Sequence, residues 1–372
     1  SIGPNTNAIE HAGQTLALVE GGGANYRLTE ELDTLGTCDF GGTLYGGYTA
    51  HPHRDPVTGD LHAVSYSFAR GHTVQYSVIG ADGRARRTVD IPVHGFPMMH
   101  DFSLTERYVV VYDLPVVFDP SAVVPDGVPR PLRPAVGKLI GGLTRRGSVP
   151  GPIAARIAAD TTPITSLPFA WDASYPARVG VMPRDGGADD VRWFDIDPCY
   201  VFHVVNAFDT GNSLEIQAVR YPELWRHDGG FDADGVLWSW TLDLVRGTVT
   251  ERQLDERGVE FPRIDDRLAG LPARYGVAVG GDRLVRYDLT DGSAAERAFD
   301  GGRPGEAVFV PAAGSTDESD GWYLAYVYDP ARNGSDLVIL DASDFGGAAV
   351  ATIHLPQRVP YGFHGNWITG HS

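Results

Sequence analysis

The sequence predicts an all-β protein, and three observations support this class. Short runs of β-branched and aromatic residues recur along the chain, most of them bounded by Gly, Asp, Asn or Pro, as is typical of strands. The clearest runs are 16–19, 108–112, 201–205, 236–242 and 322–328. Asp-Gly or Asn-Gly pairs, which favour tight turns, begin at 82, 234, 291, 320 and 333. The 372 residues include 46 Gly and 26 Pro, which suits many short strands joined by turns.

In the last third of the chain, the order strand, turn, strand repeats several times. One instance is the run 283–289, which is followed by Thr290-Asp291-Gly292. Such an order is typical of the blades of a β-propeller. No exact repeat is visible, however, and the chain is long enough for two domains. The periodicity therefore indicates an all-β fold more firmly than it indicates a propeller.

One segment departs from this pattern. From Leu114 to about Asp172 the chain is rich in Pro, Ala, Val and Gly, with a basic patch at Lys138, Arg145 and Arg146. Two stretches in it predict short helices, 136–143 and 153–159. Because the segment is too long for a hairpin loop, we interpret 114–172 as an inserted cap or lid. A packed excursion without a separate role is the alternative. The apolar and basic mixture also suits a peripheral contact with a membrane surface.

The composition excludes several classes of protein. Hydrophobic residues make up 42% of the chain and charged residues 21%, as in a globular protein. The net charge of -18 argues against a nucleic-acid partner and against an anionic lipid surface held by electrostatics. Cys38 and Cys199 are the only cysteines, which excludes a disulfide framework and a thiolate metal cluster.

We expect neither a targeting segment nor a membrane-spanning one. The sequence has no run of about 18 or more apolar residues. Its first residues, Ser1-Ile2-Gly3-Pro4, lack the basic and apolar regions of a signal peptide. The two cysteines fit a reducing compartment. These features predict a cytoplasmic protein.

Four of the 12 histidines stand in short, distinctive phrases. They are His51, His100, His203 and His364. They lie too far apart in the sequence for a helical pair or a compact finger. A closed fold of equivalent elements would instead point one histidine from each element at a common axis. Neutral imidazoles without a thiolate partner suit iron, copper, zinc or nickel, so we predict a metal site.

The other eight histidines are predicted to lie on the surface or in ordinary packing contacts. They are His11, His53, His62, His72, His94, His227, His354 and His371. His53 is the closest competitor of His51, because residues i and i+2 of a strand share a face. Pro52, which lies between the two, argues against such a strand.

The phrases around the four histidines occur with several others in an order that matches a known family. They are Asn5-Thr6-Asn7, Thr49-Ala50-His51-Pro52, Asp55-Pro56-Val57-Thr58-Gly59-Asp60, His100-Asp101-Phe102-Ser103-Leu104-Thr105, Phe202-His203, Glu260-Phe261-Pro262-Arg263-Ile264 and Phe363-His364-Gly365. On these segments the chain resembles the carotenoid cleavage oxygenase family, which also contains stilbene-cleaving dioxygenases and the retinoid isomerohydrolase of the retinal pigment epithelium. The resemblance extends over almost the whole chain, as far as Trp367.

The resemblance implies a seven-bladed β-propeller with a small α-helical cap, formed as a single domain by residues 1–372. It also implies that the four histidines bind one ferrous ion (Fe2+) on the axis. Three glutamates would accept hydrogen bonds from three of the imidazoles, which fixes each ring and makes it a better donor. The matching residues are Glu20, Glu260 and Glu306. Thr6 matches a residue whose methyl group crowds one open position of the iron.

Two departures from the family pattern affect these expectations. Members usually carry a further N-terminal segment that includes a first blade, whereas this chain begins almost at Asn5-Thr6-Asn7. We therefore expect a propeller that lacks the usual N-terminal segment. Stilbene-cleaving members tend to carry a Lys just before the first glutamate, where this chain has Val19. That difference disfavours a stilbene substrate.

The function implied is that of a non-haem Fe2+ dioxygenase. Both atoms of O2 would be inserted across an electron-rich C=C bond of a carotenoid or apocarotenoid, giving two carbonyl products. The reaction needs a redox metal, which zinc is not. An apolar tunnel would position the polyene, and Phe202, Phe363 and Trp367 either line it or belong to the propeller core.

Three alternatives stay open at this point. The substrate could be a hydroxystilbene or a related olefin. The propeller could bind a partner or a metal without catalysis, or the reaction could be isomerisation without cleavage. The sequence leaves undetermined which bond is cleaved, how long the polyene is and which oligomer forms.

Overall fold

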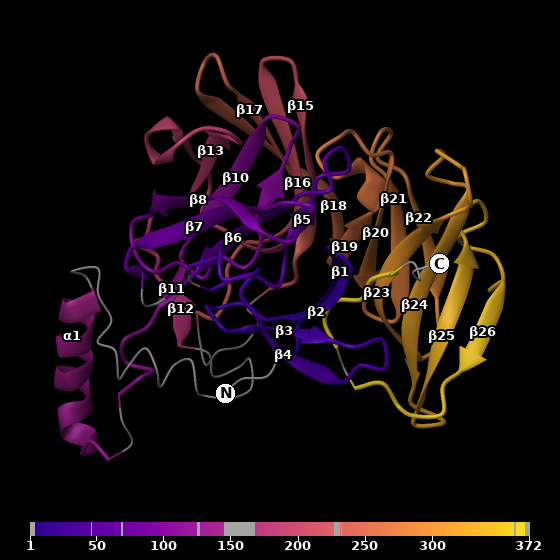
Figure 1. Ribbon diagram of the computed structural model, residues 1–372, viewed down its shortest axis with the longest axis horizontal. Helices are drawn as coiled ribbons and strands as arrows, with labels where there is room; N and C mark the ends of the chain where they lie inside the picture. The colour runs from indigo at the N-terminus through magenta and orange to yellow at the C-terminus, as the bar shows by residue number, and fades with distance from the viewer. Residues whose placement is uncertain are drawn as a thin grey trace.

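The computed structural model of the chain describes residues 4–45, 47–67, 70–124, 127–144, 168–226, 231, 233–360 and 362–368. In these residues the strands form six four-stranded antiparallel sheets and one two-stranded sheet. The four-stranded sheets are arranged side by side as the blades of a propeller (Figure 1). The prediction of an all-β protein is confirmed.

The blades are numbered here in chain order. Blade 1 contains β1–β4 (Asn7–His11, Gln14–Leu18, Asn25–Leu28, Thr34–Cys38), and blade 2 contains β5–β8 (His53–Arg54, Leu61–Tyr66, Thr73–Ile79, Ala85–Pro92). Blade 3 contains β9, β10, β13 and β14 (Ser103–Leu104, Tyr108–Asp113, Arg178–Pro183, Arg192–Asp195), and blade 4 contains β15–β18 (Tyr200–Thr210, Ser213–Tyr221, Val236–Asp243, Thr248–Gly258). Blade 5 contains β19–β22 (Glu260–Ile264, Tyr275–Gly280, Arg283–Asp288, Ala294–Ala298), and blade 6 contains β23–β26 (Arg303–Pro311, Gly321–Asp329, Gly334–Asp341, Ala351–His354). The first strand of each of blades 3, 4 and 5 contacts the first strand of the next blade, so these strands surround the axis.

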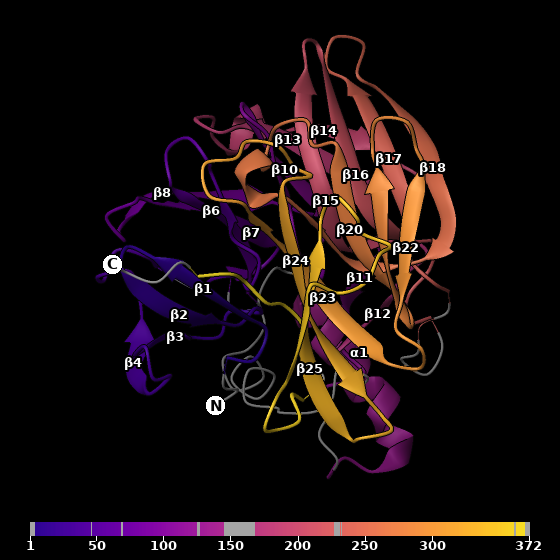
Figure 2. The same ribbon diagram turned by 90° about the vertical axis from the view of Figure 1, so that its right-hand side faces the viewer.

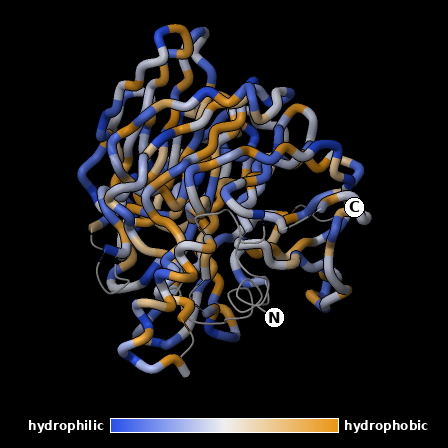
Figure 3. Tube along the Cα trace, turned by 90° about the vertical axis from the view of Figure 1, so that its left-hand side faces the viewer, coloured by the Kyte–Doolittle hydropathy of each residue, from blue (hydrophilic) through white to orange (hydrophobic). Residues whose placement is uncertain are grey.

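Strand β24 shows why these runs form strands between blades. Its side chains alternate between the two faces of the sheet, as successive residues of a strand must. Tyr323, Ala325 and Val327 are buried, whereas Trp322 and Tyr326, which point to the opposite face, are exposed. Figure 3 shows hydrophobic residues concentrated in the strands at the centre of the molecule.

Neighbouring blades share hydrophobic clusters. Leu16 and Leu18 of blade 1 lie in one cluster with Leu61 and Ala63 of blade 2. A second and larger cluster joins blades 2, 3, 4 and 5, and a third joins blades 5 and 6. No cluster of the described residues joins blade 6 back to blade 1.

The resemblance implies seven blades, whereas the described part of the chain forms six. Blades 1 and 6 are connected by the C-terminal segment, which runs from blade 6 toward β1 (Figure 2). The seventh blade stays a prediction.

The predicted insertion lies between β10 and β13 of blade 3. It begins and ends with β11 (Val116–Phe118) and β12 (Phe169–Trp171), which pair with each other. The 3-10 helix Arg130–Leu132 leads into α1 (Arg133–Thr144), which stands at the edge of the molecule (Figure 1, left). The expected helix at 136–143 is therefore confirmed. The expected helix at 153–159, Arg145 and Arg146 lie outside the described residues.

The described residues also contain the 3-10 helices Ala188–Asp190 and Asp266–Leu268. No helix among the described residues has both the length and the apolar character needed to cross a membrane.

The packing of His62 in blade 2 leads to a prediction about pH. His62 is 5% exposed and its Nδ1 lies 2.7 Å from the Tyr76 hydroxyl oxygen. Burial, with a smaller effect of Arg184, lowers the pKa of His62 to about 4. The unfolded chain, with an ordinary pKa near 6.5, binds this proton first, so we expect stability to fall as the pH drops from about 6.5 to about 4.

The full effect would amount to about 3 kcal/mol, at 1.36 kcal/mol per pKa unit. His62→Asn keeps a polar group near Tyr76 but does not titrate. We expect urea unfolding of this variant to show a weaker loss of stability between pH 6.5 and 4 than the parent protein. Equal pH profiles for the two proteins would contradict the prediction.

Candidate metal centre

The four predicted histidines come from different elements and meet on the propeller axis. His51 lies just before β5, and His100 just before β9. His203 is part of β15, and His364 belongs to the C-terminal segment after β26. One ligand nitrogen from each lies within 4.8 Å of the others. The structure therefore brings together the four histidines named from the sequence.

The imidazoles are buried and face one another. His51, His100 and His203 are 7–8% exposed, and the His364 side chain is 6% exposed. The Nε2 atoms of His100 and His203 lie 3.2 Å apart. The Nε2 atoms of His51 and His364 are buried with no hydrogen-bond partner. Because buried polar atoms are nearly always satisfied, two unpartnered nitrogens converging with the close pair of His100 and His203 fit a metal ion.

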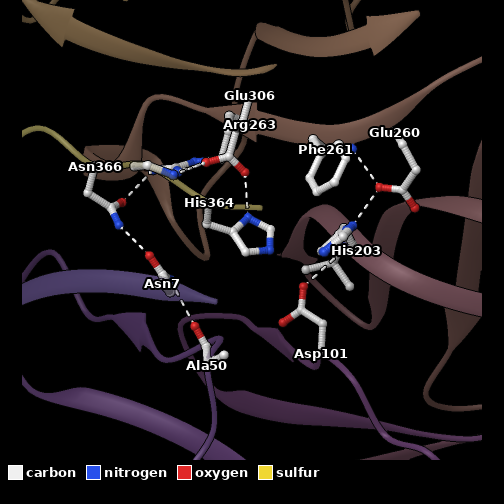
Figure 4. A network of polar contacts seen from close by, with 12 residues as sticks. Asn7, Ala50, Asp101, His203, Glu260, Phe261, Arg263, Glu306, His364 and Asn366 are labelled. Carbon is white, nitrogen blue, oxygen red and sulfur yellow. Dashed lines mark hydrogen bonds and ion pairs between the residues drawn. The ribbon is translucent and has the colours of Figure 1, made fainter. Parts of the chain in front are cut away.

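Carboxylates lie against three of the four rings, and two of these contacts, those of Glu260 and Glu306, are hydrogen bonds. Glu20 Oε2 lies 2.8 Å from Nδ1 of His100, and Glu260 Oε2 lies 2.5 Å from Nδ1 of His203. Glu306 Oε2 lies 2.7 Å from Nδ1 of His364. A proton on each Nδ1 leaves the Nε2 lone pair free to bind a metal. Figure 4 shows the second and third of these pairs.

In the pairs of Glu260 and Glu306 the charges favour an ionised carboxylate. Burial opposes ionisation of Glu260, but His203 and the N–H of Phe261 outweigh it and lower the pKa of Glu260. Burial lowers the pKa of His203, and the Glu260 carboxylate more than offsets this and raises it. His51 has no such carboxylate, so burial and the neighbouring histidines hold its pKa well below the ordinary value.

Arg263 extends the network behind His364. One guanidinium nitrogen donates to Glu306 Oε1 at 2.6 Å and to the carbonyl of Gly365 at 2.9 Å. The other donates to Asp266 at 3.0 Å and to Asn366 Oδ1 at 3.1 Å. Burial opposes ionisation of Glu306, but Arg263 and then His364 outweigh it and lower the pKa of Glu306 to about 2. Arg263 stands in one of the motifs named in the sequence analysis, but its contact with Glu306 was not predicted.

Asn366 carries the network on to blade 1. Its side-chain nitrogen donates to Asn7 Oδ1 at 2.7 Å and to the carbonyl of Ala8 at 2.8 Å. The Asn7 side chain donates in turn to the carbonyl of Ala50, which precedes His51 (Figure 4). The segments that carry His364 and His51 are thus joined by polar contacts.

The backbone is irregular next to His203 and Glu260. The β15–β16 pairing shifts register on both sides of Val204, next to His203. The β19–β20 pairing shifts after Glu260, where Phe261 has a φ of 52°. A phenylalanine in this left-handed region is unusual and tends to mark a functional site. The Phe261 ring lies 5.1 Å from the His203 ring, a contact that the sequence did not indicate.

The aromatic residues predicted for a tunnel are placed differently from one another. Phe202 is 5% exposed and meets the His100 ring edge-on at 5.3 Å. Phe363 is half-buried. Trp367 is 55% exposed and lines a cavity of about 340 Å3 beside the histidines.

The lining of that cavity is polar and apolar in about equal parts. It includes His51, Asp101, Asn206, Arg263, His364 and Trp367. Phe202 is not among its lining residues, and belongs to an aromatic cluster with Tyr200, Tyr221, Trp225 and Phe231. The metal centre therefore has a cavity of mixed polarity on one side and an aromatic cluster next to His100.

Thr6 contacts the centre through its backbone. Its carbonyl accepts a hydrogen bond from the N–H of His364 at 3.2 Å. Its hydroxyl donates to Asn5 Oδ1 at 3.0 Å. Thr6 thus lies beside the segment of one ligand.

The remaining described histidines lie outside the cluster of four. His11 is buried against the carbonyl of Gly80, and His354 is paired with Asp336 on the surface. His94 lies beside Asp113, and His53 beside Asp101. His227 and His371 lie outside the described residues.

Four histidines converge on the axis of a β-propeller, without a cysteine ligand and with carboxylates beside three of them. These features define a class of β-propeller proteins that bind a metal ion on the propeller axis. The family model described as RPE65, retinal pigment epithelial membrane protein, matches residues 3–369. The chain belongs to this family of RPE65-like proteins and carotenoid cleavage oxygenases. The resemblance drawn from the sequence is confirmed.

Similar proteins cover nearly all of this chain. A carotenoid cleavage oxygenase of Mycobacterium tuberculosis is 52% identical over 386 aligned positions, which span 98% of this chain and 77% of the relative. An apocarotenoid-15,15'-oxygenase of Synechocystis is 29% identical over 98% of this chain and 72% of its own length.

Two solved structures show the same fold. The cobalt-substituted Synechocystis ACO superposes with a TM-score of 0.80 at 27% identity, covering 99% of this chain and 74% of the other. A lignostilbene dioxygenase of Pseudomonas brassicacearum superposes with a TM-score of 0.81 at 27% identity, covering 99% and 75%.

Proposed function

We propose that this protein is a non-haem Fe2+ dioxygenase that cleaves a C=C bond of a carotenoid or apocarotenoid with O2 and yields two carbonyl products. The observation that carries the proposal is the set of four buried imidazoles, three of which are held by carboxylates. The names of the relatives supply the substrate class. Ferrous iron, held by His51, His100, His203 and His364, would supply the one-electron chemistry by which O2 is activated.

The protein's own residues hold and orient the reacting groups. Glu20, Glu260 and Glu306 keep a proton on Nδ1 of their imidazoles, so that the opposite nitrogen stays a donor. Phe202 and the aromatic cluster around it provide an apolar wall beside His100, which suits a polyene. We propose this side as the start of the substrate tunnel, with Phe363 as a second wall.

Two residues have narrower proposed roles. Thr6 would shape the oxygen side of the centre, which its contact with the His364 backbone supports. Trp367 lines the cavity of mixed polarity beside the histidines, which supports a place for it at the substrate tunnel.

The function is tested by metal content and turnover together. The protein is purified under reducing conditions, its iron is quantified, and it is incubated with an apocarotenal in air while the polyene absorbance is followed. We expect near-stoichiometric iron and bleaching, with two carbonyl products in the extract. Iron without bleaching would contradict the substrate class, and an iron-free protein that cannot be loaded would contradict the metal centre.

A hydroxystilbene is the second candidate substrate, because a lignostilbene dioxygenase is among the similar structures. Val19, which is 5% exposed and apolar, offers no cation to a substrate phenol. The same assay with a hydroxystilbene separates the two, and faster turnover of the stilbene would favour this second candidate.

Replacement of Glu260 tests the role of the carboxylates. Glu260→Gln keeps the size of the side chain but weakens the hydrogen bond to His203, since a neutral amide is a poorer acceptor. We expect the affinity for Fe2+ to fall about 10- to 100-fold. Glu251→Gln, in blade 4 away from the axis, is the control. Unchanged affinity in Glu260→Gln would contradict the proposed role.

We propose α1 as a point of peripheral contact with a membrane. Leu132, Leu139 and Leu143 expose 55%, 65% and 36% of their surface around this helix, and Lys138 is exposed among them. Leu139 and Leu143 are four residues apart in α1 and therefore share one helical face, and Leu132 ends the 3-10 helix that leads into it. An apolar face of this kind suits insertion at the level of the headgroups, where the substrate would be dissolved.

The double variant Leu139→Gln/Leu143→Gln should bind neutral phosphatidylcholine vesicles at least about 100-fold more weakly, because each buried leucine contributes about 1.5–3 kcal/mol and about 1.4 kcal/mol corresponds to a factor of ten. Cosedimentation with vesicles measures the effect. Val245→Gln, a change at a site that is 71% exposed in another part of the molecule, is the matched control. If the parent protein, the double leucine variant and Val245→Gln cosediment equally, α1 is not the membrane contact.

We further propose that residues 1–372 act as one propeller unit, with 114–172 as its cap. The shared clusters between successive blades support the single unit, and α1 supports the cap. Seven blades are proposed for the complete ring, in keeping with the family resemblance.

A further inference from the structure

The carboxylate of Asp101 is placed among the segments that carry the metal ligands. Asp101 is 7% exposed and directly follows His100. Its Oδ1 accepts hydrogen bonds from the Phe102 N–H at 2.8 Å and from Nε2 of His53 at 2.9 Å. Its Oδ2 accepts from the Val204 N–H at 3.0 Å. Figure 4 shows Asp101 beside His203.

Each of these donors is close in sequence to a ligand. Val204 follows His203, at the point where the β15–β16 register is irregular. A buried N–H in such a place needs an acceptor, and Asp101 supplies it. Phe102 lies two residues after His100, so the same carboxylate also fixes the turn that leads from this ligand into β9.

His53 connects the carboxylate to the fourth ligand. It lies two residues after His51, with Pro52 between them, and proline restricts the backbone of this connection. The His53 ring is held from a second side by Phe102, whose ring lies 4.7 Å away and perpendicular to it. The orientation of the His51 side chain is therefore coupled to the contact between His53 and Asp101.

His51 is also the one member of the four that none of the three glutamates contacts. We propose that Asp101 is a positioning residue. Together with His53, it holds His51 in the orientation for metal binding. Through its hydrogen bond from Val204, it also fixes the position of the neighbouring His203. One buried carboxylate would thus fix the relative positions of three ligands. This inference rests on the metal centre proposed above.

The test compares metal affinity with the stability of the metal-free protein. Co2+ is the probe, because a solved relative is cobalt-substituted and the ion is stable in air. The dissociation constant is measured by calorimetry and by the visible absorption of bound Co2+, and the thermal midpoint is measured without metal. In Asp101→Asn, the amide nitrogen faces N–H donors that need an acceptor. We expect Co2+ to bind about 10- to 100-fold more weakly and its absorption bands to shift.

Variants at His53 keep the test decisive if Asp101→Asn fails to fold. His53→Gln retains an N–H that reaches Asp101, so its affinity should stay near that of the parent protein. His53→Leu has no hydrogen-bond donor for Asp101, so we expect its Co2+ affinity to fall about 10-fold. Combining it with Asp101→Asn should lower the Co2+ affinity little further. Asp113→Asn changes a fully buried carboxylate far from the centre, so it controls for destabilisation alone and should leave the Co2+ affinity unchanged.

Two outcomes would overturn the proposal in different ways. If the parent protein binds Co2+ and the folded Asp101→Asn and His53→Leu variants bind it equally well, the positioning role is wrong and the metal centre stands. If the parent protein itself binds no Co2+, the metal centre is wrong, and the role of Asp101 with it.

Discussion

Replacement of His203 by alanine should abolish tight metal binding and the turnover of an apocarotenal. The Nε2 of His203 lies 3.2 Å from that of His100, and its ring lies 4.8 Å from the ring of His364. Loss of a hydrogen-bond partner of a ligand already weakens metal binding about 10- to 100-fold, so loss of the ligand itself should exceed 100-fold. The change also leaves the buried Glu260 carboxylate without its imidazole. Iron content, the Co2+ dissociation constant and bleaching of the polyene measure these effects.

His94→Ala is the matched control for this experiment. The His94 side chain is 48% exposed and lies beside Asp113, outside the cluster of four. We expect parental iron content and turnover from it. A His203→Ala protein that retained stoichiometric iron and full turnover would remove the four-histidine centre from the proposal.

The second large effect is expected at Arg263. Its guanidinium is 16% exposed and pairs with Glu306, whose side chain is 2% exposed. Arg263→Met leaves Glu306 buried without its main cation, and breaking a buried ion pair from one side costs about 3–5 kcal/mol. We expect a loss of this size in urea unfolding at pH 7. We also expect weaker Co2+ binding, because His364 and its backbone depend on the same network.

The pH dependence of this variant should differ from that of the parent protein. In the parent protein, the pKa of Glu306 is lowered to about 2. The ionised carboxylate therefore contributes to stability above the ordinary glutamate pKa near 4.5, and this contribution is lost as the pH falls toward 2. Without Arg263 the folded pKa rises toward the ordinary value, and this part of the acid sensitivity becomes smaller. A parental acid profile in Arg263→Met would contradict this account.

Arg332→Met provides the comparison on the surface. Arg332 pairs with Asp329 and Asp336, and its side chain is 41% exposed. Exposed pairs contribute about 1 kcal/mol or less because water screens them. If both arginine variants lost equal stability, burial of the Glu306 pair would not be the cause.

Much of the fold could be predicted from local sequence. The runs at 108–112 and 322–328 became β10 and β24, because β-branched and aromatic side chains fill the pleated faces between blades. The helix at 136–143 also formed, with its start at Arg133. The number of blades could not be predicted in this way, since it depends on how the sheets associate rather than on the pattern within one sheet.

The centre was predictable to the extent that residue types in motifs carry it. The four histidines could be named because each stands in a recognisable phrase. The contacts of Asp101 and Arg263 could not, because they join segments that lie far apart in the chain, such as Asp101 with His53 and Arg263 with Asn366. Phe261 was missed because nothing in its local sequence reveals a positive φ.

The segment that carries His364 has a consequence for the folding of the whole chain. The N–H of His364 donates to the carbonyl of Thr6, and the side chain of Asn366 donates to Asn7 and Ala8. Two parts of the chain at nearly maximal separation in sequence therefore meet at the metal centre. An ion that bridges His51 and His364 would close a loop of some three hundred residues, and the entropy of such a loop rises only with the logarithm of its length. Metal loading should therefore couple the two ends of the polypeptide thermodynamically, and a chelator should lower the unfolding temperature of the entire propeller rather than of one blade.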